Sequence, residues 1–475
     1  MKPEIKKSIQ KVNIKGWKKI YMEFGTDFLE ISVPPGCVTL SMKDVSALAD
    51  PRSSIEKALS APIGSPTLEN IVRKKGKPVS RLTVSIAVSD ITRPVPYRGE
   101  KGILIPLLKR LESVGVRKEN IKIVVGTGMH RPSTPDEKIE MFGESLTRDF
   151  HIFDHKCEDL QSLTQIRKTH RNTDVYVNTD FFAADIKIVT GLVESHFMAG
   201  VSGGRKGVCP ALVDIRTIEK FHGPDFLESP YADNLILAGN PCHQEALDIA
   251  KAVGVDFTVN VTLDKNMKLT GVFAGDLEKA HAQAFQFMKD YTAIPLSQEF
   301  DIVLTHGGYA GRNHYQAAKA GCGALPAVKK KGTIIIAADN RDQEPIGSPE
   351  YLNLLRRLKI LGIEAYIDLI KDPDRTFTKD QWEPEVWGRV LRKVGEKGLI
   401  YCAPQIPPED YSLLPGRSGF DFLEKNKALS GRDAAQSMVQ NSLLFVISRH
   451  LDKGIKPSLA FLREGPYGIP YLQKR

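Results

Sequence analysis

Three histidines lie in loops of the kind that carry acid–base chemistry. His130, His196 and His222 each stand in a segment bounded by glycine or proline, with basic residues close by. Imidazole is the side chain best matched to proton transfer near neutral pH, and its neutral form binds soft and borderline metal ions. Two of these histidines on opposite sides of one carbon would suit a racemase, whereas all three together would suit a zinc site. The residue types alone leave both interpretations open.

The densest glycine segment, residues 200–207, contains Ser202 and Lys206. It departs from a phosphate-binding loop, because arginine precedes Lys206 and glycine follows it in place of Ser or Thr. It matches the Gly-x-Ser-x-Gly turn of hydrolases, which would make Ser202 a nucleophile. It also suits backbone amides that approach a phosphate or a flat cofactor, with Lys206 as a charge or an amine nucleophile. The preceding strand ends near Gly191, too early for a hydrolase turn, and this favours the cofactor interpretation.

A second polar group lies in the C-terminal half of the chain. Tyr315, Gln316 and Lys319 follow the segment His306-Gly-Gly closely. Residues three apart share a helix face, so Gln316 and Lys319 would reach the same ligand. At the first turn of a helix they would favour an anion such as a carboxylate. A solvent-exposed turn with salt bridges is the alternative.

The elements that must position these residues follow from hydrophobic periodicity. Short β-branched runs alternate with longer amphipathic runs, which predicts the α/β class with mainly parallel sheets covered by helices. The predicted strands span residues 82–89, 121–125, 174–177, 185–190, 301–305, 332–338 and 398–402. The predicted helices span residues 104–114, 135–146, 277–291, 313–330, 349–361 and 385–397. Ligands of open α/β sheets bind beyond the carboxyl ends of the strands, where the polar groups gather here.

One break in this pattern indicates a domain boundary. Proline and polar residues interrupt it at 294–300, before a fresh series of strands and helices begins. We therefore predict two α/β domains, residues 1–294 and 295–475, within a chain long enough for several. The tail from about Ala434 is apolar and helical, and we expect it to pack back on the first domain.

Composition narrows the class of protein. Lys and Arg number 66 against 57 Asp and Glu, and this excess is spread thinly. No zinc finger or RNA-recognition signature accompanies it, so no nucleic-acid partner is expected, and a non-catalytic nucleic-acid-binding protein is only the third hypothesis. The six cysteines are far apart, as in buried thiols of a cytoplasmic protein. No apolar run is long enough for a membrane span, and no signal peptide is expected.

Taken in order along the chain, the motifs resemble those of the nickel-dependent lactate racemase family. The first two are Asp90-x-Thr92-Arg93-Pro and Gly126-Thr-Gly-x-His130-Arg-Pro, and the others are His196 with Ser202-Gly203-Gly204-Arg-Lys206, His222, Tyr315-Gln316-x-x-Lys319 and Asp380-Gln-Trp382. The steps of ten residues from His196 to Lys206 and sixteen from Lys206 to His222 also agree with the family. One such motif would be weak, whereas the ordered set is specific.

The resemblance implies an isomerase with two α/β domains and an active site in the cleft between them. The implied reaction inverts the C2 carbinol of a 2-hydroxy acid, lactate or a larger one, by reversible hydride transfer to nickel pincer nucleotide. This cofactor is a pyridinium-3-thioamide-5-thiocarboxylic acid mononucleotide that binds nickel. By the same resemblance, His130 and His196 would be the acid and base, Lys206 would tether the cofactor, and His222 would bind the nickel ion.

The remaining roles also come from the resemblance. The cofactor would contact Asp90, Thr92, Ser202, Gly203 and Gly204. The substrate would contact Arg93, Tyr315, Gln316, Lys319 and Trp382, and Asp90 would orient Arg93. The implied partners are a small anionic 2-hydroxy acid and the proteins that build the cofactor, with room for a homo-oligomer. The alternative function is a serine hydrolase that uses Ser202.

Overall fold

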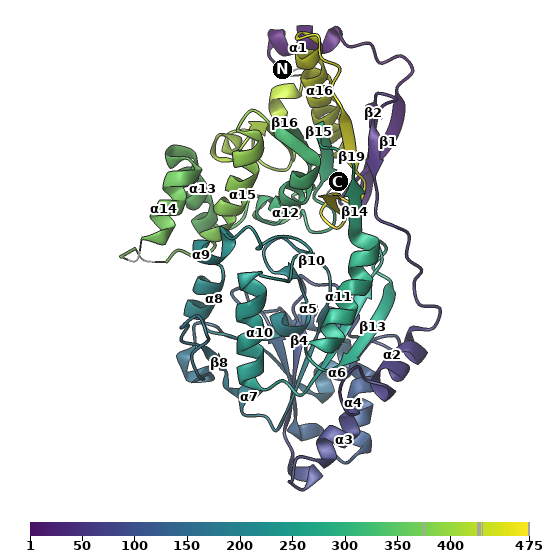
Figure 1. Cartoon of the computed structure of the whole chain (residues 1–475), viewed down its shortest axis with the longest axis vertical. Helices are drawn as coiled ribbons and strands as arrows, with labels where there is room; N and C mark the ends of the chain where they lie inside the picture. The colour runs from purple at the N-terminus through teal and green to yellow at the C-terminus, as the bar shows by residue number, and fades with distance from the viewer. Residues whose placement is uncertain (373, 376, 425–428, 430, 474–475) are drawn as a thin grey trace. The chain divides into compact units, whose positions relative to one another are not determined.

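The structure, a computed structural model, describes residues 1–372, 374–375, 377–424, 429 and 431–473 (Figure 1). The chain divides into two compact units. One unit is Asp44–Tyr291, and the other combines Met1–Lys43 with Thr292–Arg475. Both are α/β units with mostly parallel sheets, which confirms the predicted fold class.

The unit of Asp44–Tyr291 is built on a six-stranded sheet with the order β13-β12-β9-β4-β5-β6. All neighbours are parallel except β12 and β13, which are antiparallel. The strands are β4 (Val84–Ser89), β5 (Ile121–Gly126), β6 (His151–Asp154), β9 (Ile186–Leu192), β12 (Phe257–Leu263) and β13 (Leu269–Gly275). β4 is buried along almost its whole length, as expected of a central parallel strand with both faces covered.

Amphipathic helices supply that cover. In α4 (Leu104–Ser113) the buried leucines at 104, 107, 108 and 111 are three or four residues apart and so share one face. The other helices are α2 (Pro51–Ser60), α3 (Leu68–Arg73), α5 (Pro135–Phe142), α6 (Glu144–Asp149), α7 (Thr179–Phe182), α8 (Ile215–Phe221), α9 (Pro224–Leu227), α10 (Pro241–Val253) and α11 (Lys279–Thr292). Short strand pairs join β7 (Leu163–Gln165) to β8 (Tyr176–Asn178) and β10 (Ser195–His196) to β11 (Gly200–Val201).

The second unit has a six-stranded sheet with the order β18-β17-β16-β15-β19-β3, in which every pair is parallel. Its strands are β3 (Val38–Leu40), β15 (Phe300–His306), β16 (Val328–Ala337), β17 (Leu399–Cys402), β18 (Arg417–Ser418) and β19 (Leu459–Leu462). β1 (Lys18–Phe24) and β2 (Asp27–Val33) form a hairpin, and β14 (Ala293–Leu296) pairs with β20 (Ile469–Leu472). The helices are α1 (Pro3–Gln10), α12 (His314–Ala324), α13 (Pro349–Leu361), α14 (Ile363–Lys371), α15 (Trp382–Val394) and α16 (Gly431–Leu451).

The two ends of the chain belong to the same unit, which corrects the predicted domain limits. β3 pairs with β19, so residues 1–43 pack with the C-terminal half and not with residues 44–291. The tail helix α16 likewise packs within its own unit, where Met438 and Val439 share a core with Met22 and Ile31 of the hairpin. Hydrophobic periodicity could not show this, because it reports the local face of an element and not its distant partner.

Three element predictions also change. The helix predicted at 313–330 ends at Ala324, and the chain passes through a short 3₁₀ turn with Pro326 into β16. The helix predicted at 135–146 is interrupted at Gly143, whose φ of 81° does not belong to a helix. The strand predicted at 174–177 becomes β8, in a two-stranded pair outside the main sheet.

Two predictions from composition concern the cysteines and membrane-spanning segments. All six cysteines are buried. Within the described ranges, no helix combines the length and the apolar character needed to cross a membrane.

Candidate active site

Asp90 and His130 come together from the loops that follow β4 and β5. The buried Asp90 places Oδ2 2.6 Å from His130 Nδ1, and its Oδ1 accepts a hydrogen bond from Thr92 Oγ1 at 2.6 Å. Burial would raise the pKa of Asp90, but His130, Thr92 and Arg93 outweigh it and lower the pKa to about 2. The carboxylate is therefore ionised and accepts the proton of Nδ1. A neutral His130 consequently carries its lone pair on Nε2.

Arg93 forms an ion pair with Glu194. Its Nε lies 3.1 Å from Glu194 Oε1, and both side chains are half-buried. The Asp90 carboxylate is hydrogen-bonded to His130 and Thr92 instead, which corrects the expectation that Asp90 orients Arg93 directly. Arg93 still acts on Asp90 through its charge. Glu194 lies two residues before His196 in the sequence, but its position in the sequence does not predict that it pairs with Arg93.

His196 has the opposite arrangement of ring nitrogens. It ends β10, and its Nδ1 accepts hydrogen bonds from the backbone amides of Met198 at 3.4 Å and Ala199 at 3.3 Å. A neutral imidazole that accepts at Nδ1 carries its proton on Nε2. His196 Nε2 lies 3.1 Å from Lys206 Nζ, so these two residues, which the resemblance places in one site, are in contact.

Lys206 follows in a 3₁₀ turn, Gly204–Gly207, with its amine in the same cluster. Burial, together with the charges of Arg93 and Arg205, lowers the pKa of Lys206 to about 7. A substantial share of the amine is therefore neutral at neutral pH, unlike an ordinary lysine. A neutral amine can accept the Nε2 proton of His196, so the contact and the lowered pKa agree. Such an amine is also a competent nucleophile.

His222 lies just after α8 and is held as a neutral ring. Its Nδ1 lies 3.0 Å from the carbonyl of Ile218, one turn earlier, to which it donates. Burial, with the charges of Lys206 and His130, lowers the pKa of His222 to about 3. The neutral ring then carries its lone pair on Nε2. Histidines that bind metal ions usually donate their other N–H in this way, so His222 fits a metal ligand.

The glycines at 203 and 204 support the loop through packing. Both have positive φ, 73° and 51°, and a Cβ at Gly204 would meet the ring of His281 at 2.7 Å. The Gly204 amide donates to Asn260 Oδ1 at 2.9 Å. This amide is therefore engaged within the protein, and contact of Gly203 and Gly204 with the cofactor stays a prediction.

Ser202 is buried within the same turn. Its Oγ donates to the carbonyl of Leu192 at 2.7 Å and accepts from the amide of Glu194 at 3.0 Å. A serine nucleophile needs a hydrogen bond to a general base. Because the Ser202 proton goes to a backbone carbonyl, the geometry indicates a structural role and does not favour the hydrolase alternative.

Arg205 is a member of this site that the sequence analysis left without a role. It is only 1% exposed. Its guanidinium donates to the carbonyls of Ala199 and Val201 at 2.8 Å, and its Nη1 lies 2.8 Å from Nε2 of His281, which also lies 2.9 Å from the Ser202 carbonyl. An arginine in a glycine-rich segment gives no sequence signal of burial, because its usual place is the surface.

The second unit places its four predicted substrate residues on two helices, α12 and α15. Tyr315 and Lys319 lie on α12, and Trp382 begins α15, where its side chain is hydrogen-bonded to Tyr315. Burial raises the pKa of Glu383 well above its usual range, against the nearby charge of Lys319. Gln316 lies in the first turn of α12, where its backbone amide donates to Oδ1 of the cap residue Asn313 at 2.9 Å.

Two other features lie outside this arrangement. Among the residues that the structure describes, no three His, Cys, Asp or Glu side chains are grouped to hold a metal ion, so the three-histidine zinc site is not formed there.

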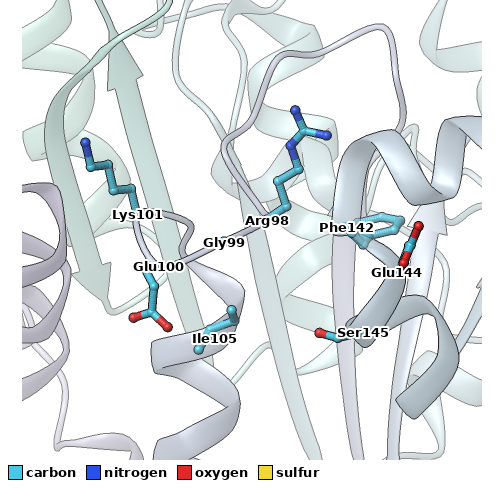
Figure 2. Close-up of a pocket in the computed structure, with 9 residues that line it drawn as sticks. Arg98, Gly99, Glu100, Lys101, Ile105, Phe142, Glu144 and Ser145 are labelled. Carbon is cyan, nitrogen blue, oxygen red and sulfur yellow. The ribbon is translucent and has the colours of Figure 1, made fainter.

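A surface cavity of about 500 Å³ lies between the loop before α4 and the α5–α6 turn. Figure 2 shows Arg98 and Lys101 on one side of it and Phe142, Glu144 and Ser145 on the other. None of the candidate site residues lines this cavity.

Comparison with known proteins agrees with the motifs. Residues 24–234 match the lactate racemase N-terminal domain, and residues 296–440 match the lactate racemase C-terminal domain. A lactate racemase of Lactiplantibacillus plantarum is 36% identical over 402 residues, which cover 83% of this chain and 91% of the relative. A lactate racemase of Thermoanaerobacterium thermosaccharolyticum is 30% identical over 338 residues, 71% of this chain and 76% of the relative.

A solved structure shows the same relationship. The lactate racemase apoprotein from Thermoanaerobacterium thermosaccharolyticum aligns with a TM-score of 0.78 at 25% identity, over 96% of this chain and 100% of that chain. The resemblance inferred from the motifs is thereby confirmed. The chain belongs to the lactate racemase family.

Proposed function

We propose that this protein is a racemase or epimerase of a small anionic 2-hydroxy acid that works with nickel pincer nucleotide. The observation that carries the proposal is the opposite state of two histidines in one site. At Nδ1, His130 faces the Asp90 carboxylate and His196 faces two backbone amides, so the neutral form of His130 has a lone pair on Nε2 and the neutral form of His196 has a proton there. Inversion through an oxidised intermediate needs one group to remove the hydroxyl proton and another to return a proton.

The residues present fit the cofactor. Lys206 offers a buried amine with a lowered pKa of about 7, suited to a thioamide link. His222 offers a neutral imidazole whose other nitrogen is held by Ile218, suited to nickel. When bound, the cofactor supplies an acceptor for the hydride of C2.

The side chains of this chain would then manage binding and protons. Arg93 would attract the substrate carboxylate, as an arginine suits planar recognition of a carboxylate. His130 Nε2 would accept the hydroxyl proton, and Asp90 would stabilise the imidazolium without taking the proton, since its pKa is about 2. His196 Nε2–H would serve the opposite enantiomer as the acid, and the roles reverse in the other direction. The positive groups around Lys206 favour the developing alkoxide.

The roles of the second unit remain part of the proposal. Lys319, Gln316 and Tyr315 would bind the substrate carboxylate, and Trp382 would border the substrate. Proteins that build the cofactor would have to act before this chain becomes active, in the cytoplasm.

The proposal is tested by producing the chain together with a nickel-pincer biosynthesis system. We expect racemisation of one pure 2-hydroxy acid enantiomer, about one nickel ion per chain, and a nucleotide-sized mass on the peptide that contains Lys206. Lys206→Met is the control for the tether and should lose the added mass. If folded protein gains neither nickel nor the added mass while a known family member loads in the same cells, the proposal is wrong.

A further inference from the structure

We propose that Arg205 is a positioning residue for His196, because its guanidinium holds the β10–β11 turn in the shape that fixes the tautomer of the His196 ring. The inference rests on the proposed acid–base role of His196. It concerns how the chain prepares that histidine before any cofactor or substrate is bound, and it can be tested in the unloaded protein.

The contacts of Arg205 are concentrated on one turn. Nη2 donates to the carbonyls of Ala199 and Val201 at 2.8 Å, and Nη1 makes longer contacts with the carbonyls of Gly203 at 3.4 Å and Ser202 at 3.5 Å. Within the described part of the chain, no carboxylate forms an ion pair with this guanidinium. Its charge is balanced by the dipoles of backbone carbonyls. A buried cation without a counter-ion is costly to keep, which points to a use for it.

The same turn controls the ring of His196 from its amide side. The amides of Met198 and Ala199 donate to His196 Nδ1, and Ala199 is the residue common to both sets of contacts. Its carbonyl accepts from Arg205, and its amide donates to His196. Holding the carbonyls therefore orients the amides, and the amides place the proton of the neutral ring on Nε2, toward Lys206.

An arginine suits this task better than a lysine. The planar guanidinium reaches two carbonyls and the His281 ring at once, whereas an ammonium is a point charge on a flexible stem. Arg205→Lys therefore separates two possible roles. It keeps a positive charge beside Lys206 but loses the fork that holds the turn.

The test measures the tautomer of His196 by nitrogen NMR of unloaded protein labelled with ¹⁵N-histidine, with His196→Gln used to assign the signal. The wild-type ring should show protonated Nε2 and unprotonated Nδ1. Arg205→Lys and Arg205→Met should both give a mixture of tautomers. Arg110→Lys is the matched control, because Arg110 also binds with a fork, to Glu56 at 2.8 Å and Glu69 at 2.9 Å, away from this turn. It should leave the His196 signal unchanged.

A second variant covers the case in which the Arg205 variants do not fold. His281→Leu removes the ring that contacts Nη1 and leaves both carbonyl contacts of Nη2, so it should shift the tautomer in the same direction but less. A single wild-type tautomer in Arg205→Lys, or in His281→Leu when the arginine variants do not fold, would overturn the inference.

Kinetics of the loaded enzyme give an independent reading. Arg205→Lys should lower kcat about 10-fold or more while KM for the 2-hydroxy acid stays within about twofold, since proton transfer and not substrate binding is disturbed. A loss confined to KM would contradict the positioning role. Failure of the proposed function would look different, because wild-type protein would then be inactive while the NMR result could still hold.

Discussion

The two units build similar parallel sheets and place their chemistry differently. In the unit of Asp44–Tyr291, ionisable side chains follow the strand ends directly, as Asp90 follows β4 and His130 follows β5. In the other unit, the histidine at the end of β15, His306, is fully buried. Its Nε2 donates to the carbonyl of Arg463 at 2.8 Å, and its Nδ1 accepts from the amide of Gly308 at 3.1 Å. A histidine bound to backbone at both nitrogens supports the fold and has no nitrogen left for proton transfer.

The electrostatics of the two units differ in the same sense. Around Lys206 the pKa of the amine is lowered, and around His222 the ring is neutral, so these groups are prepared for bond-forming or proton-transfer roles. Beside Lys319, burial raises the pKa of Glu383 well above its usual range, which favours the neutral form of this carboxyl. From this difference we expect the first unit to carry the chemistry and the second to hold an anion.

The strongest way to break this comparison is to remove both histidines of the first unit. His130→Gln with His196→Gln should lower racemisation by about 10⁴-fold, because no side chain remains to carry protons. The measurement is conversion of one pure enantiomer by loaded protein, with nickel content and the Lys206 mass as controls for loading. Substantial retained activity in loaded, folded double variant would remove both residues from the mechanism.

The pH response of Lys206 sharpens the comparison next. Because the pKa of Lys206 is lowered to about 7, its amine is neutral above that pH and protonated below it. At pH 7 its neutral fraction should exceed that of an ordinary lysine by about 10³-fold. Acylation of unloaded protein, followed at the Lys206 peptide by mass spectrometry, should level off above about pH 8 while a lysine peptide continues to accelerate. A rate that rises in parallel with the peptide would show an unshifted amine.

A smaller effect is expected from the anion-binding residue of the second unit. Lys319→Ala should raise KM for the 2-hydroxy acid by about 10-fold and change kcat much less, since one charge–carboxylate contact is lost. Lys329→Ala serves as the control, because Lys329 is half-exposed and paired with Asp301 at 2.9 Å. A fall in kcat with unchanged KM would place Lys319 in the chemical step, against the division between the units.

The smallest effect concerns Ser202. Ser202→Ala removes hydrogen bonds to the Leu192 carbonyl and the Glu194 amide, so unfolding free energy should fall by about 1–2 kcal/mol. Racemase activity should stay within about threefold of wild type, since no step uses the hydroxyl. Chemical denaturation and the enantiomer assay measure both quantities. Labelling of Ser202 by an organophosphonate probe in folded protein would revive the hydrolase alternative.

Much of the first unit can be predicted from local patterns. Strands at 82–89 and 121–125 and the helix at 104–114 were expected close to β4, β5 and α4, because a buried element leaves a periodic apolar signature. The family resemblance carried by the motifs placed His196, Lys206 and His222 in one site, and in the structure His196 contacts Lys206 while the charge of Lys206 acts on His222. Local patterns and motifs can be recognised in the sequence because the residues that form them are close together in the chain.

Other features depend on contacts between distant residues. The pairing of β3 with β19 joins opposite ends of the chain, and the local pattern of either strand does not show which strand it pairs with. The ion pair of Arg93 with Glu194 and the burial of Arg205 are similar cases. From the sequence alone, each of these charged side chains would be expected at the surface, because its partners are known only from the folded structure.

The sequence by itself determined the class of fold, the residue types at the strand ends and the family to which the chain belongs. The tertiary structure alone decided the state of each ring. His130, His196 and His222 are the same side chain, and they differ because a carboxylate, two backbone amides and a backbone carbonyl respectively reach their Nδ1 atoms. The proton of an imidazole follows its hydrogen-bond partner, and that partner is chosen by folding and not by the neighbouring residues in the chain.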